Sequence, residues 1–385
     1  MRGVAVIGVG MTAVSAGSDK GLKELFVEAA TNAIEDAGVD RLDSMYVGNM
    51  MSGYLQQQEH LGALMATAIG REGIPSYKVE GACASGGVAV NAGVKAVLSG
   101  LEGVVLVGAV EKMTGYTTPE VTAGLMMAED RTKVATTGIS FVGLNALIAR
   151  RYMHQYKVSS EDLAEFPVLC HENALNNPRA QFHKKISTED VLRSPFVADP
   201  LHLLDCSAIG DGAAAIVLAP SDMARKFTDS PVEIAASAVA TDIISLYQRP
   251  DITTFEASRK AAAQAYGTAH IKPDDVDLVE VHDAFSVLGI MALEDLGFER
   301  KGSGVRLVKD GVCARGGRLP TNTFGGLKAR GHPVGASGLY GIAEVALQLS
   351  NKAGKCQVPD AEVGLAQSVG GIGTTITVHV LKRGA

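Results

Sequence analysis

The chain has 385 residues, of which 46% are hydrophobic and 44 are glycine, and this length fits two domains of comparable size better than one core. Its formal net charge of -7 argues against nucleic acid as the main partner. Five cysteines without C-x-x-C spacing favour neither a disulfide framework nor a metal site, so we expect a reducing, cytoplasmic compartment. No apolar run reaches the roughly 18 residues that span a bilayer, so we expect no membrane segment.

The N-terminal stretch predicts a strand at Val4–Val9 followed by a loop. Gly8 to Ala13 contain a G-x-G-x-x-A pattern, but the polar residues 14–19 stand where a dinucleotide site would have a helix. The pattern therefore does not indicate a nucleotide cofactor. An amphipathic helix over 21–38 and a strand over 45–47 are expected next.

A cysteine among small residues, Cys83, lies where an extended segment changes into an apolar helix over 88–98. At a helix N-terminus, the helix dipole and the free backbone N–H groups stabilise a thiolate and lower its pKa. Gly86 and Gly87 allow a substrate to approach closely. These residues alone leave two interpretations open, a reactive nucleophile or a buried structural cysteine.

A break in the alternation of strands and helices follows the strand expected at 104–110. Residues from about 111 to 204 are Met-rich and then helical and charged, which predicts an insertion that covers a site. The alternation returns with a short buried strand over 212–218. We therefore place an inserted loop domain within the first half of the chain.

The second half repeats the first in outline. Its expected elements are strands at 232–236, 277–281 and 376–380, a helix at 258–266, and a glycine-rich turn that leads into a helix over 325–349. We expect an α/β fold of two duplicated βα halves, residues 1–222 and 223–385. Equivalent loops of such halves meet at a shared face, where sites commonly form.

Two of these equivalent loops carry histidines. His282 follows the strand at 277–281, and His332 lies in the glycine-rich turn that matches the place of Cys83. A thiolate nucleophile needs a base, and an acyl thioester needs hydrogen-bond donors for its carbonyl oxygen. Cys83, His282 and His332 supply both, which favours the interpretation of Cys83 as a nucleophile.

The motifs around these residues resemble those of the thiolase family. They are GHPVGASG at 331–338, DGAAAIVL at 211–218 and ASRKA at 257–261, and their order covers nearly the whole chain. The His-Asp pair at 282–283 is similar to that of archaeal and sterol-carrier-protein-type thiolases. The resemblance implies a layered αβαβα fold and no permanently bound cofactor, with coenzyme A or acyl-CoA as substrate.

The same resemblance implies roles for individual residues. Cys83 would be the acylated nucleophile, and His332 would activate it. The oxyanion hole would be formed by the backbone of Cys83 and Gly370 together with His332. His282 would be a further hydrogen-bond donor, and Ser258 would contact the pantetheine of CoA.

The sequence departs from the family at a second catalytic cysteine. Gln367 occupies its usual C-terminal position, and Ala284 occupies the position that sterol-carrier-type thiolases use instead. Because Gln367 cannot titrate, the hypothesis is that His282 both donates to the oxyanion and carries a proton near neutral pH. Three further cysteines are interpreted as ordinary core or surface residues, namely Cys206, Cys313 and Cys356. The alternative is that one of these three reaches the site by a route that the sequence does not show.

The expected activity is a CoA-dependent acyl transfer that forms or cleaves a 3-oxoacyl-CoA, above all acetoacetyl-CoA, by Claisen condensation in lipid metabolism or the mevalonate pathway. The alternatives are a C-acyltransferase or decarboxylating, ketoacyl-synthase-like enzyme with another acceptor, and a weakly catalytic scaffold. Apolar composition and the resemblance predict a homodimer or tetramer. Some archaeal thiolases also form a complex with 3-hydroxy-3-methylglutaryl-CoA synthase and an OB-fold protein of the DUF35 type.

Overall fold

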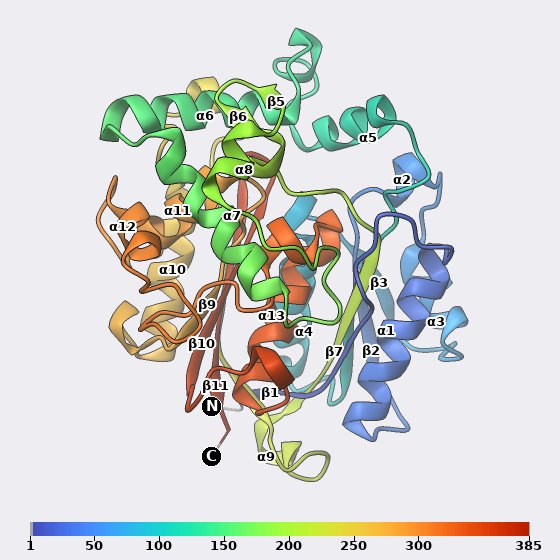
Figure 1. Cartoon of the computed structure of the whole chain (residues 1–385). Helices are drawn as coiled ribbons and strands as arrows, with labels where there is room; N and C mark the ends of the chain where they lie inside the picture. Colours follow the sequence, from blue (N-terminus) through green and yellow to red (C-terminus); the bar gives the residue numbers. More distant parts are fainter. Residues whose placement is uncertain (1–2, 385) are drawn as a thin grey trace.

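The strands of the chain form one large sheet and one small hairpin in this computed structural model, which describes residues 3–384. The large sheet has the order β3-β2-β4-β7-β1-β8-β11-β10-β9 (Figure 1). Its strands are β1 (Val4–Met11), β2 (Ser44–Gly48), β3 (Ser76–Val79), β4 (Val105–Glu111), β7 (Gly212–Pro220), β8 (Val232–Thr241), β9 (Leu278–Glu280), β10 (Val363–Gly370) and β11 (Thr375–Arg383).

The longer helices either cover the two faces of this sheet or lie in the inserted segment. They are α1 (Leu22–Ala37), α3 (Leu61–Ala68), α4 (Ser85–Ser99), α5 (Thr118–Leu125), α6 (Phe141–Tyr156), α7 (Ser160–Ala174), α10 (Glu256–Ala269), α11 (Ser286–Asp295) and α13 (Ser337–Leu349). Shorter helices are α2 (Ser52–Leu55), α8 (Thr188–Arg193), α9 (Ser221–Ala224) and α12 (Gly304–Lys309), and the hairpin is formed by β5 (Phe196–Ala198) and β6 (Leu201–His202).

The predicted duplication is confirmed by the strand directions. In the first half β2 is parallel to β3 and β4, and β7 is antiparallel to β4 and β1. In the second half β9 is parallel to β10, and β11 is antiparallel to β10 and β8. A parallel bridge between Val279 and Thr321 stands where the first half has the pairing of β2 with β3. The halves join where β1 pairs with β8 at Ala5–Glu233 and Val6–Val232.

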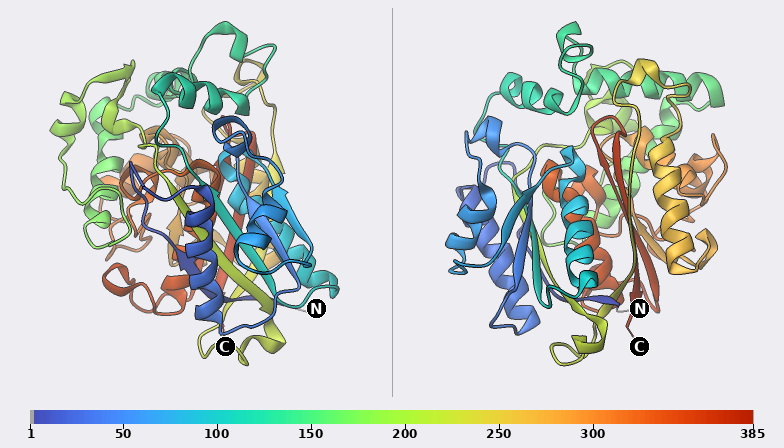
Figure 2. Two further views of the ribbon diagram at one scale, coloured as in Figure 1. Left: turned by 90° about the vertical axis from the view of Figure 1, so that its right-hand side faces the viewer. Right: turned by 180° about the vertical axis from the view of Figure 1, so that it is seen from behind.

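The helices and strands lie in the layered order that the sequence predicted. In the right-hand view of Figure 2, α1 and α3 cover the first-half strands, α4 and α13 lie in the middle, and α10 covers the second-half strands on the other side. Apolar side chains from α4, α13 and both sets of strands form one buried cluster in the middle layer. This packing places the N-termini of α4 and α13 side by side, and these are the helix starts that carry Cys83 and His332.

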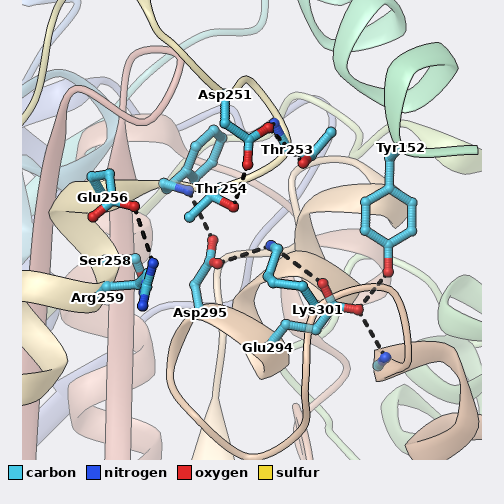
Figure 3. A network of polar contacts seen from close by, with 12 residues as sticks. Tyr152, Asp251, Thr253, Thr254, Glu256, Ser258, Arg259, Glu294, Asp295 and Lys301 are labelled. Atoms are coloured by element: carbon cyan, nitrogen blue, oxygen red, sulfur yellow. Dashed lines mark hydrogen bonds and ion pairs between the residues drawn. The ribbon is translucent and has the colours of Figure 1, made fainter. Parts of the chain in front are cut away.

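The inserted segment between β4 and β7 lies over one end of the two halves (Figure 1). Its helices α6 and α7 pack against α11. A buried polar network fastens this contact, in which the Tyr152 hydroxyl donates to Glu294 (Figure 3). The ammonium of Lys301 lies 3.2 Å from a Glu294 oxygen and 2.8 Å from an Asp295 oxygen. The insertion is therefore held to the second half by a buried hydrogen bond to a charged network, as well as by apolar packing.

One expectation about an individual segment needs correction. Ala82–Ser99 is a helical stretch long and apolar enough to cross a bilayer by length and composition, although no such run was expected. Most of this stretch is buried between the two halves, as in the core helix of a globular fold. Gln367 lies in strand β10, which was not among the expected elements and pairs with β9 and β11.

Candidate active site

Cys83 lies in a single turn, Ala82–Ala84, that leads directly into α4. Ala82 has a φ of 52°, a left-handed conformation that is strained for a residue with a side chain and is common at functional sites. The predicted helix-start position is confirmed. The predicted lowering of the pKa is not, because burial raises the pKa of the Cys83 thiol to about 12. Cys83 therefore needs a proton acceptor in order to react.

Glycines bring the two helix starts together. A Cβ atom on Gly86 would lie 2.8 Å from the Leu339 backbone nitrogen and 3.0 Å from the Gly335 carbonyl oxygen. These are backbone atoms that cannot rotate away, so a side chain at Gly86 would push α4 and α13 apart. The close contact of the helices places the Cys83 turn beside the loop that carries His332.

His332 is buried and has a defined hydrogen-bond partner. Its Nδ1 lies 2.7 Å from the Ser337 Oγ, and this hydroxyl is 3.1 Å from the Pro333 carbonyl oxygen. If Ser337 donates to Pro333, then His332 Nδ1–H donates to Ser337, which leaves the Nε2 of His332 unprotonated. Burial first, with the nearby His282 and Arg330, holds the pKa of His332 well below its usual range. The arrangement suits a neutral imidazole that accepts a proton from a neighbouring thiol.

His282 lies behind His332 and does not line the cavity described below. The two rings meet edge to face with their centroids 5.1 Å apart. Burial, and secondarily Arg330, lowers the pKa of His282 to about 3. This lowering opposes the hypothesis that His282 carries a proton near neutral pH, because it favours a neutral ring, and that role stays a prediction. A role as hydrogen-bond donor remains a prediction.

A narrow cavity of about 180 Å³ brings Cys83 and His332 together under the inserted segment. It lies at the junction of both halves and the insertion, and its walls are largely apolar with a few hydroxyl groups. The lining residues are Cys83, Thr118, Val121, Thr122, Leu125, Phe141, Val142, Cys206, Ser207, Ile209, Ala284, Phe285, His332 and Val334. Apolar walls with few polar groups are typical of sites that hold a small organic substrate.

Gln367 and Ser258 form a buried structural bridge. The Gln367 side chain donates from Nε2 to the Ser258 Oγ at 2.7 Å and accepts at Oε1 from the His282 backbone N–H at 3.4 Å. Ser258 has no exposed surface and does not line the cavity. The expectation that Ser258 contacts pantetheine stays a prediction, and in this structure its hydroxyl is enclosed and bonded to Gln367. Ser207, which the sequence analysis did not single out, lines the cavity.

The glycines at the end of β10 pack against the Cys83 turn. A Cβ atom on Gly370 would lie 2.1 Å from the Gly81 carbonyl oxygen. The backbone N–H groups that hydrogen-bond with the Cys83 sulfur, and so lower its pKa against the effect of burial, belong to Gly371 and to Cys83 itself. The participation of Gly370 in an oxyanion hole stays a prediction, and the amide of Gly371 is a donor that the sequence did not reveal.

A buried carboxyl group, Glu111, connects loops of both halves beside Cys83. It accepts hydrogen bonds from the backbone N–H groups of Met50 and Met51 and from that of Gly335. Burial raises its pKa to about 8. A charged residue at the end of an otherwise apolar strand was the sequence signal for this group. Within residues 3–384, no cluster of His, Cys, Asp and Glu could hold a metal ion.

Comparison with known proteins identifies the family. A model described as "Thiolase, N-terminal domain" matches residues 4–222, and one described as "Thiolase C-terminal domain-like" matches residues 238–383. The chain belongs to the thiolase family. It is 50% identical over 385 residues to an acetyl-CoA acetyltransferase of Methanothermobacter thermautotrophicus, with all of both chains covered.

Two further relatives place this thiolase among those that the sequence resembles. It is 32% identical to human sterol carrier protein 2, covering all of this chain and 72% of that protein. The solved structure titled "Ltp2-ChsH2(DUF35) aldolase" matches with a TM-score of 0.87 and 25% identity, covering 99% of this chain and 98% of that one. The predicted membership of the thiolase family is confirmed, and the protein is a thiolase-type acyltransferase.

Proposed function

We propose that this thiolase condenses two molecules of acetyl-CoA to acetoacetyl-CoA and also catalyses the reverse cleavage. This proposal rests on the enclosure of Cys83 and His332 in one cavity of about 180 Å³. Such a volume suits a short acyl group better than a long chain. Full-length similarity to an acetyl-CoA acetyltransferase supports the same substrate.

In the first half-reaction, His332 Nε2 accepts the proton of the Cys83 thiol. As this proton leaves, the sulfur attacks the carbonyl carbon of acetyl-CoA, and coenzyme A leaves. Backbone N–H groups beside Cys83 stabilise the negative oxygen of the tetrahedral intermediate. Because the pKa of the buried thiol is about 12, the proton moves to His332 as the thiolate attacks, so that no free thiolate accumulates.

The test is a pair of measurements on the purified protein. Incubation with acetyl-CoA should place one acetyl group on the peptide that contains Cys83, and acetoacetyl-CoA with free CoA should yield acetyl-CoA. Cys83→Ser should lose both results, and Cys313→Ser is the matched control because Cys313 is buried away from the cavity. Label on another cysteine, or cleavage by Cys83→Ser, would contradict the proposal.

The alternative activity, a decarboxylating condensation, differs from this proposal in the acyl acceptor. Gln367 replaces the usual second cysteine, and a decarboxylating condensation needs no base to form its carbanion. Supplying malonyl-CoA in place of the second acetyl-CoA tests this alternative. Condensation with malonyl-CoA and none with acetyl-CoA would favour it.

We further propose a cytoplasmic homo-oligomer that uses CoA thioesters as substrates without a permanently bound cofactor, and that supplies acetoacetyl-CoA to the mevalonate pathway. The likeness to an aldolase structure with a DUF35 component supports a partner of that type. We propose 3-hydroxy-3-methylglutaryl-CoA synthase as a second partner. Sedimentation of the protein alone, and then with each partner, measures these associations. A single monomeric species at micromolar concentration would contradict the oligomer.

A further inference from the structure

Carbon–carbon bond formation needs a base that removes an α-proton from the second acetyl-CoA. Gln367, at the usual position of this base, is an amide held between Ser258 and the His282 backbone. His282 does not line the cavity that Cys83 and His332 share, so its ring is separated from a substrate methyl group held there. The group that performs this step must therefore be sought elsewhere on the cavity wall.

The positions of the free thiols narrow the search. Cys170 is fully buried and donates to the Asp283 carboxylate at 3.3 Å. Cys313 is buried in the core of the second half, and Cys356 packs in a small apolar cluster away from the cavity. Cys206 is half-buried and lines the same cavity as Cys83 and His332.

Backbone pairing fixes Cys206 beside the loop that follows β9. Cys206 forms an antiparallel bridge with Phe285, and the Ser207 N–H donates to the Ala284 carbonyl at 2.8 Å. Ala284 stands at the position where sterol-carrier-type thiolases carry a cysteine. The bridge therefore brings a thiol from the inserted segment next to the place where this chain lacks one.

A buried cation lies behind Cys206. The Lys328 side chain is 2% exposed, and its ammonium donates to the carbonyl oxygens of Asp205 and Ala284, the second at 3.4 Å. Its charge lowers the pKa of Cys206, although burial has the larger effect and raises that pKa to about 11. In the resting state the Cys206 thiol donates to the His202 carbonyl at 3.4 Å. An ammonium beside a thiol favours loss of the thiol proton.

We propose that Cys206, with Lys328 beside it, is the acid–base residue of the condensation. This assignment rests on the proposed acyl transfer through Cys83. In the first half-reaction His332 takes the Cys83 proton, and Cys206 gives its proton to the departing CoA sulfur. In the second, the Cys206 thiolate takes an α-proton of acetyl-CoA, and the carbanion attacks the acetyl carbonyl on Cys83. The Cys83–acyl bond then breaks, and the Cys83 sulfur takes back the proton from His332, so that charge and protons balance.

The experiment separates acylation from proton removal in Cys206→Ser and Cys206→Ala. Acetylation of Cys83 should stay within a few-fold of the unmodified enzyme, because the CoA thiolate leaves without strong assistance. Acetoacetyl-CoA formation, and exchange of acetyl-CoA methyl protons with deuterated water, should fall by about 10²–10⁴-fold. Lys328→Met should move the pH dependence of condensation to higher pH, since the thiolate loses its ammonium neighbour, and Lys328→Arg should restore part of it. Cys313→Ser serves as the control thiol.

Each outcome bears on one proposal. If the unmodified enzyme condenses acetyl-CoA and Cys206→Ala does so at a similar rate, the assignment of Cys206 is overturned and the proposed function stands. If acetoacetyl-CoA never forms but methyl-proton exchange depends on Cys206, the proposed product is wrong and the assignment stands. Equal losses of Cys83 acetylation and condensation in Cys206→Ser would indicate a purely structural role and overturn the assignment.

Discussion

The rings of His282 and His332 meet edge to face with centroids 5.1 Å apart, at the junction of the two halves. Burial lowers the pKa of both rings, and each would be disfavoured as a cation by Arg330. Two imidazoles in such contact repel each other when both are cationic, so at most one takes up a second proton during turnover. His332 has the hydrogen-bonded Ser337 and borders the cavity, which makes it the proton acceptor of the pair.

A substitution at His282 tests this division of roles. His282→Asn keeps a hydrogen-bonding side chain, so turnover should stay within about tenfold of the unmodified enzyme and the pH profile should keep its shape. His282→Ala removes the donor and should lower kcat by about 10²-fold. Steady-state kinetics across pH 6 to 9 measures both variants. A loss of about 100-fold in His282→Asn with intact Cys83 acetylation would instead restore the proton-carrier hypothesis.

Ser337 is expected to act through the orientation of His332. Ser337→Ala removes the partner of Nδ1 and permits the tautomer whose Nε2 carries a proton, so Cys83 acetylation should slow by about 5–20-fold, the equivalent of one hydrogen bond of about 1–2 kcal/mol. Ser337→Thr keeps a hydroxyl and should recover most of the rate. Rapid-quench measurement of acetylation provides the readout. Equal rates in Ser337→Ala and the unmodified enzyme would show that the backbone alone fixes the ring.

The duplicated fold was predictable because strand and helix patterns recur in both halves of the sequence. The same recurrence placed Cys83 and His332 on equivalent loops, and the structure puts both on one cavity wall. The join between β1 and β8 was not visible, because it depends on two residue pairs far apart in the chain.

Burial explains what the sequence could not show at the site. A motif placed Ser258 near CoA, but only the folded chain shows that its hydroxyl is enclosed and bonded to Gln367. The thiol pKa expected from a helix N-terminus was reversed by the low exposure of Cys83, which sequence spacing does not report. The bridge with Phe285 holds Cys206 at the cavity, and the local sequence does not predict this tertiary pairing.

The charge network under the insertion predicts a pH-dependent loss of stability. Burial raises the pKa of Asp295 to about 6, and Lys301 opposes this rise. Since the folded pKa lies above the value of 3.8 for a free group, the folded state binds more proton, and this contribution to stability is lost as pH rises through about 6. Lys301→Met removes the opposing charge, so the folded pKa rises further and the loss extends to higher pH.

Thermal unfolding should therefore show a larger effect of Lys301→Met at pH 8 than at pH 5. The half-buried lysine leads us to expect about 1–3 kcal/mol at pH 8, which is several degrees in Tm, and less than half of this at pH 5. Lys20→Met is the control, because the ion pair of Lys20 with Glu28 is exposed on α1. Equal shifts of Tm at both pH values would show that Asp295 is not the group that senses pH.

A glycine substitution tests the contact between β10 and the Cys83 turn. A Cβ on Gly370 would meet the Gly81 carbonyl oxygen at 2.1 Å, and a backbone atom can yield only if the turn moves. Gly370→Ala should cost about 1–3 kcal/mol of stability or more, and should slow Cys83 acetylation by at least about tenfold because the sulfur is displaced from the Gly371 N–H. Gly267→Ala is the matched control, because Gly267 lies in helix α10 and a Cβ there would meet no atom within 4 Å. We expect this variant to gain about 0.5–1 kcal/mol of stability with unchanged activity. Wild-type acetylation in a correctly folded Gly370→Ala protein would show that this contact does not position the nucleophile.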